Sequence, residues 1–182
     1  LVGFGTQLTR GGWLFKQEAA RIDGLELTRS TPLEPAPPGA EGLFLPQDAR
    51  AVQRYDMLLG AEYFGMADTT FSVELAARYI DDFGEDLARS GYQKWRSESA
   101  FRMTRDFMNQ RLRLLLVSVL FSRDGQFWTS SGGAIHRASA EYELTDSLRL
   151  TGGIAVYESG QREPFNIAGR NDRLFGEIRW SF

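Results

Sequence analysis

The stretch DRLFGEIRWSF at residues 172–182 decides the fold class. Every second residue counted back from Phe182 to Leu174 is apolar or small, and the residues between them are polar or charged, apart from Phe175. A period of two predicts a β-strand with one apolar and one polar face. The length matches the roughly 9–11 residues that a tilted strand needs to cross a bilayer. A strand that keeps this pattern to its last residue is typical of an outer-membrane barrel.

Composition is compatible with one domain, residues 1–182, and excludes several classes of protein. Apolar residues make up 42% of the 182 residues and charged residues 25%. The longest apolar run, residues 114–121, is far shorter than the roughly 18 residues of a membrane helix, but a barrel needs only alternate apolar residues. A net charge of −3 gives no basis for a nucleic-acid partner. Cysteine is absent, which excludes disulfides and thiolate metal sites.

Alternation and turn residues predict nine strands, at about residues 1–8, 13–27, 55–64, 69–80, 99–105, 110–122, 132–144, 147–158 and 172–182. Residues 28–50 hold five of the six prolines and are predicted to be a long loop. Residues 81–98 are predicted to be a polar loop. Long and short connections alternate, which favours an all-β, antiparallel, up-and-down transmembrane β-barrel with the Pro-rich loop outside the cell. Since the sequence begins without Met or a signal peptide, we expect a processed chain or the C-terminal portion of a larger barrel.

The predicted strands separate apolar from charged side chains. The apolar face carries residues such as Leu59, Val73, Leu116 and Ile154, and a single Arg or Lys at the bilayer midplane would cost about 2–4 kcal/mol there. The opposite, lumen-facing set is Lys16, Glu18, Asp56, Glu62, Glu74, Arg78, Arg102, Asp106, Arg111, Arg113, Arg137, Glu141, Glu143, Arg149, Glu177 and Arg179. These charges fit either a salt-bridged, plugged lumen or a polar pore that selects solutes.

Aromatic side chains fall near the predicted strand ends, where a membrane protein meets the interface. One predicted group, at the periplasmic ends, is Tyr63, Phe71, Phe107, Tyr142, Trp180 and Phe182; the other, at the outer ends, is Tyr55, Tyr79 and Trp128. Two places fit this scheme poorly. The strand that starts at Trp13 would expose Gln17 and Arg21 to lipid, and Arg105 also points to the apolar side.

Three stretches resemble a family of large Gram-negative outer-membrane β-barrels of undefined, porin-like function: residues 8–16, DMLLGAEY at 56–63, and residues 169–172 with the strand that follows. The resemblance implies a C-terminal portion of such a barrel, with transport or passive permeation of small solutes, apolar compounds among them. The last strand also resembles the signal read by the barrel-assembly machinery, at Leu174, Gly176, Ile178, Trp180 and Phe182. The implied partners are this machinery, outer-membrane lipid and lipopolysaccharide.

We predict no enzymatic activity, cofactor or metal. The single histidine, His136, is followed by Ser139, but an offset of three places the two on opposite faces of a strand. The acidic segment 81–86 lacks the oxygen spacing of a calcium loop. A soluble, lipocalin-like carrier remains an alternative, because Gly11-Gly12-Trp13 imitates the start of such proteins and both classes have one apolar face. The favoured hypothesis is a porin-like channel or uptake barrel, with a structural, plugged barrel as the second.

Overall fold

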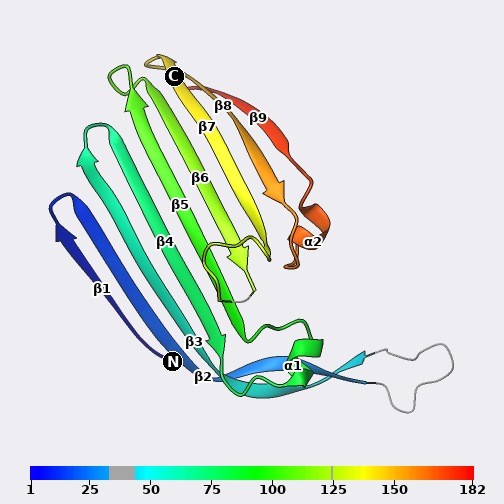
Figure 1. Ribbon diagram of the computed structural model, residues 1–182. Helices are drawn as coiled ribbons and strands as arrows, with labels where there is room; N and C mark the ends of the chain where they lie inside the picture. The colour runs from blue at the N-terminus through cyan, green and yellow to red at the C-terminus, as the bar shows by residue number, and fades with distance from the viewer. Residues whose placement is uncertain (33–43, 124) are drawn as a thin grey trace.

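The chain forms one antiparallel sheet of nine strands, each paired with its neighbours in sequence (Figure 1). The computed structural model describes residues 1–32, 44–123 and 125–182. The strands are β1 Val2–Arg10, β2 Trp13–Pro32, β3 Phe44–Met66, β4 Thr69–Ile80, β5 Trp95–Phe107, β6 Leu112–Ser122, β7 Gly133–Thr145, β8 Leu148–Glu158 and β9 Arg173–Trp180. The prediction of an all-β, up-and-down meander of nine strands is confirmed.

Tight turns connect alternate strands because the residues there tolerate the required backbone. Gly11 and Gly12 join β1 to β2 with φ of 57° and 81°. Positive φ at both central residues is the requirement of a type I′ hairpin, whose twist matches that of the strands. At the other end of the sheet, longer connections carry two short helices, α1 Glu85–Arg89 and α2 Phe165–Ala168, which the sequence did not predict.

Two predicted loops are shorter than expected. β2 and β3 extend into the range 28–50, where Pro32 pairs with Phe44 and Ser30 with Pro46 after bulges in the ladder; residues 33–43 lie outside the described part of the chain. The predicted loop 81–98 ends earlier, because β5 already begins at Trp95. Ser97 and Ser99 occupy positions on the apolar side of β5, where the alternating pattern requires apolar residues. The sequence prediction therefore missed the first four residues of the strand, 95–98.

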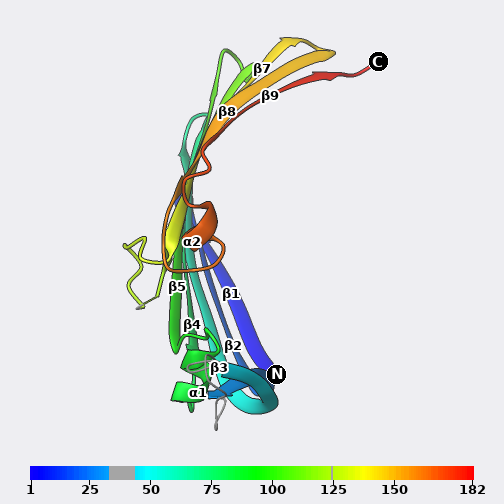
Figure 2. The same ribbon diagram turned by 90° about the vertical axis from the view of Figure 1, so that its right-hand side faces the viewer.

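The sheet is open. Within the described residues, β1 pairs only with β2 and β9 only with β8, so these nine strands do not close into a barrel by themselves. Seen edge-on, the sheet is curved, and β1 and β9 both bend toward the side on which α2 lies (Figure 2). The α2 residue Phe165 packs on Phe121, with ring centroids 4.9 Å apart. Phe121 is opposite Glu98 in the ladder, so the face that carries the charges is the concave one.

Very little of the chain is buried. Among the described residues the buried apolar side chains are Val52, Ile80, Leu87, Ala134 and Phe165, and Leu87 of α1 packs on Val52 and Ile80. The chain exposes 12195 Å², whereas a compact globular monomer of 20.5 kDa exposes about 8,900 Å². No described helix has the length and apolar character needed to cross a membrane. The sheet therefore has faces that the described part of the chain leaves uncovered.

Candidate functional site

The concave face collects the charged residues that the sequence predicted. The register of the eight strand pairs places every member of the predicted lumen-facing set on this face except Arg111. Arg111 precedes β6, and its guanidinium binds the carbonyl oxygens of Glu143 and Leu144 at the end of the sheet. One sheet face thus holds nearly all of the predicted set, which is what period-two alternation requires.

Many of these charges are paired across strands. Arg113 of β6 donates two hydrogen bonds to Asp106 of β5, at 2.7 and 2.9 Å. Arg149 of β8 bridges two carboxylates of β7, Glu141 at 3.1 Å and Glu143 at 2.9 Å. In water each exposed pair would contribute only about 0–1 kcal/mol. Their common effect is to fix the register of neighbouring strands.

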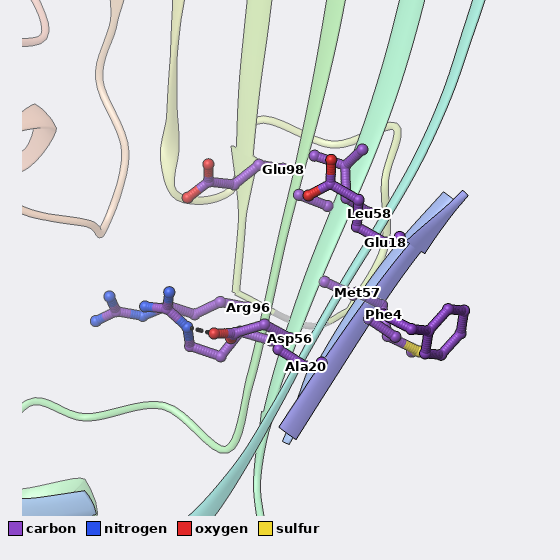
Figure 3. Close-up of a pocket in the computed structure, with 14 residues that line it drawn as sticks. Phe4, Glu18, Ala20, Asp56, Met57, Leu58, Arg96 and Glu98 are labelled. Atoms are coloured by element: carbon purple, nitrogen blue, oxygen red, sulfur yellow. Dashed lines mark hydrogen bonds and ion pairs between the residues drawn. The ribbon is translucent and has the colours of Figure 1, made fainter. Parts of the chain in front are cut away.

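A groove of about 570 Å³ crosses the concave face from β1 to β5. Its floor contains two cross-strand rows: Gly3, Ala20, Asp56, Arg78 and Arg96 form one, and Gly5, Glu18, Leu58, Ala76 and Glu98 form the other. Figure 3 shows Asp56, Arg96, Glu98 and Glu18 on one side of the strands, with Phe4 and Met57 projecting on the other. Glycine and alanine in both rows leave the space that larger side chains would fill.

The groove has an uneven distribution of charge. Asp56 accepts from two arginines, Arg54 at 2.9 Å and Arg78 at 2.8 Å. Glu98 is bound by Arg162, which reaches the sheet from the segment before α2. Arg78 and Arg96 lie directly opposite each other in the β4–β5 ladder. Arg96 and Glu98 were not predicted as site residues, because the sequence prediction assigned them to a loop.

The convex face is mostly apolar, and many of its apolar side chains are exposed. Met57 is 51% exposed, Leu59 53% and Leu116 45%, although all three lie in the middle of long strands. Aromatic rings form a row at each end of this face. Tyr79 contacts Tyr55 and Trp95 near the long connections, with centroids 6.2 and 4.6 Å away, and Trp13 contacts Tyr63 at 4.6 Å near the tight turns. Phe71 is paired with Tyr63 in the same row.

The exceptions noted in the sequence, Gln17, Arg21 and Arg105, remain on the apolar face. Gln17 lies opposite Leu59, midway along this face, whereas the two arginines lie level with its ends. Arg105 is close to the β5–β6 turn, and its guanidinium lies 4.8 Å from the centroid of Phe107. Arg21 bonds Asp23 and lies over the ring of Tyr55, near the long connections. Long arginine side chains can place their charge at an interface while their methylene groups cover apolar surface.

Near the long connections, the segment after β6 covers Ser97 and Ser99 of β5. Both buried serines donate hydrogen bonds to backbone carbonyls of that segment.

Phe175, the one apolar residue at a polar position of the last strand, packs on the concave face. Its ring lies against Gly153, where a Cβ would meet it at 2.6 Å, and Arg137 lies 4.6 Å above the ring centroid. The proposed assembly-signal residues Leu174, Gly176, Ile178 and Trp180 all belong to the convex face of β9. Leu174, Ile178, Trp180 and Phe182 are exposed there or just beyond.

A polar trio on the convex face was missed by the sequence analysis. Ser118 of β6 and His136 of β7 are direct partners, with Oγ 2.9 Å from Nδ1. Nε2 of His136 lies 3.2 Å from Glu158 of β8. Ser139 takes the opposite face, as predicted. The order serine, histidine, carboxylate is that of a nucleophilic triad, but β6 is hydrogen-bonded on both sides, so its backbone N–H groups serve the ladder rather than an oxyanion hole.

No family model matches the chain, and neither the search of curated proteins nor that of solved structures finds a significant match.

Proposed function

We propose that the nine strands form a wall of an outer-membrane β-barrel whose convex face meets lipid. The observation that carries this proposal is the apolar convex face bounded by two aromatic rows. Tyr55 and Tyr63 are eight residues apart in β3, which corresponds to about 26 Å along a strand. A tilt of about 40° reduces this to about 20 Å of depth, comparable with the apolar band of about 25 Å in such barrels.

Closure of the barrel requires partners for β1 and β9. Unpaired backbone groups cost several kcal/mol each in hydrocarbon, so membrane strands occur in closed barrels. The two edges pair with each other or with additional strands of the same barrel. Additional strands are the better solution for a solute path, because a nine-stranded barrel has an interior that side chains fill.

Within this barrel we assign the concave face to a porin-like path for small solutes. The groove and the charges along it favour a hydrated lumen. The second candidate, a structural barrel with a plugged lumen, is favoured by the cross-strand ion pairs and by α1 and α2, which pack over one end of the sheet. The two candidates differ in whether ions pass.

Planar-bilayer recording of the full-length protein separates the two functions. A channel gives discrete conductance steps, and a salt gradient gives a reversal potential that reports cation–anion preference. Arg102→Glu on the concave face should shift this potential toward cations, whereas Arg170→Glu, in the exposed segment before β9, should leave it unchanged. An unbroken electrical seal at all voltages, with correctly inserted protein, would contradict the channel and leave the structural barrel.

A further inference from the structure

We propose that the concave groove is a binding site for the carboxylate of a small monoanionic solute, held between Arg78 and Arg96. This inference names a ligand class for the proposed path, and it rests on that proposal only for its placement in a lumen. The groove itself, its arginines and its volume belong to the sheet in any environment.

The first observation is a pair of adjacent arginines, of which only one has a carboxylate partner among the described residues. Arg78 and Arg96 are direct cross-strand partners, and like charges at this position destabilise a sheet. Arg78 has Asp56 as a partner, but Arg96 forms neither a hydrogen bond nor an ion pair with any residue that the structure describes. Its five N–H donors bind no acceptor among the described residues and can therefore bind one in the groove.

The second observation is the charge of the surroundings. The charges that act on Arg96 are Arg162, Arg78, Glu98 and Arg123. Glu98 is bound by Arg162, and Arg123 binds the neutral amide of Gln161. Asp56 is shared between Arg54 and Arg78. Cations therefore outnumber anions around Arg96, and one added negative charge improves the balance.

The third observation is space of the right size and shape. Gly3, Gly5, Ala20 and Ala76 leave a groove of about 570 Å³ beside the two arginines, within the roughly 300–1,000 Å³ range of small-molecule sites. Guanidinium groups bind carboxylates through two parallel hydrogen bonds. Three carboxylates, Asp56, Glu98 and Glu18, border the groove, so a dianion such as phosphate would be repelled more strongly than a carboxylate. A monoanion is therefore the preferred ligand.

Binding can be measured on the full-length protein in detergent without any channel assay. The probes are sodium benzoate labelled with carbon-13 at the carboxylate, neutral benzyl alcohol, and inorganic phosphate, each titrated by NMR. We expect saturable benzoate binding that exceeds phosphate binding and is absent for benzyl alcohol. Arg96→Gln should weaken benzoate binding at least tenfold, and Arg96→Lys should weaken it less, because it keeps the charge and loses the planar fork.

Arg102→Gln is the matched control. It lies on the same strand and face and removes the same charge, but it lies outside the groove; benzoate binding should change by less than twofold. Arg96→Gln also removes a like-charge contact, so retained β-sheet circular dichroism is expected and confirms that binding is measured on folded protein. Equal losses in both variants, no saturable binding by the wild type, or equal binding of benzyl alcohol would overturn the site. Benzoate binding without conductance would retain the site and reject the channel, and conductance without binding would do the reverse.

Discussion

Replacing one apolar residue by a charged one tests whether lipid or water covers the convex face. Leu59 lies in the middle of β3, is 53% exposed, and is flanked in the sheet by Gln17 and Leu75. If lipid covers it, Leu59→Arg places a charge near the bilayer midplane at a cost of about 2–4 kcal/mol. This corresponds to a decrease of about 30-fold to about 700-fold in the folding equilibrium. On a face in contact with water, the same change would stay within about 0.5 kcal/mol.

The adjacent residue supplies the control. Leu58 has the same side chain on the same strand, but it faces the groove opposite Glu18. Leu58→Arg would form a cross-strand pair of opposite charge, so we expect a change of at most about 1 kcal/mol. Both variants are refolded into lipid vesicles and unfolded with urea, with tryptophan fluorescence as the readout. Equal stability of the two variants would refute the assignment of the convex face to lipid.

Three further predictions concern packing, pH and reactivity. Gly153→Ala should destabilise the vesicle-embedded protein by about 1–3 kcal/mol in urea unfolding, because a Cβ there meets a backbone carbonyl at 2.5 Å as well as the Phe175 ring, whereas Gly152→Ala has space and should have little effect. Desolvation alone would raise the pKa of Asp86, but its hydrogen bonds and the charge of Arg50 outweigh this and lower that pKa. The ion pair therefore stabilises α1 at neutral pH and is lost as the pH falls below the ordinary value of 3.8. The protection factors of the amides of residues 85–90, which correct for the intrinsic pH dependence of exchange, should fall in that range, and Asp86→Asn should already lower them at pH 7; unchanged protection in the variant would exclude this role. Ser118 should not react with a fluorophosphonate probe, because the backbone N–H groups of its strand are engaged in the two ladders, and labelling that disappears in Ser118→Ala would show that this interpretation is wrong.

The alternation of apolar and polar residues was sufficient to predict which face of the sheet each strand residue occupies. It placed Asp56, Arg78 and Glu141 on one side and Leu59 and Leu116 on the other, because a period of two fixes the side of every residue once the strand is recognised. It was insufficient where small polar residues replaced apolar ones. Ser97 and Ser99 occupy convex-face positions but are covered by a loop, so the apolar alternation is interrupted between Trp95 and Phe101 and the start of the strand was missed.

Predicting the groove and the polar trio requires the register between strands, which alternation does not give. Arg78 and Arg96 are eighteen positions apart in sequence, and their direct opposition depends on the length of the connection that contains α1. Likewise, Ser118, His136 and Glu158 lie on three consecutive strands and meet only when both ladders are aligned. Sequence periodicity gives the side of a residue, whereas its cross-strand neighbour also depends on turn geometry and bulges.

Curvature distinguishes the two classes of protein that alternation alone left open. A lipocalin-like carrier binds its ligand inside a closed barrel, so its apolar side chains lie on the concave face and its charges outside. Here the charged rows and the α2 contact lie on the concave side, and Leu59, Leu116 and Met57 lie on the convex side. Closing the sheet in the direction of its own bend would turn these apolar residues outward. The exposed apolar surface and the aromatic residues at its two ends support the proposed contact with a bilayer.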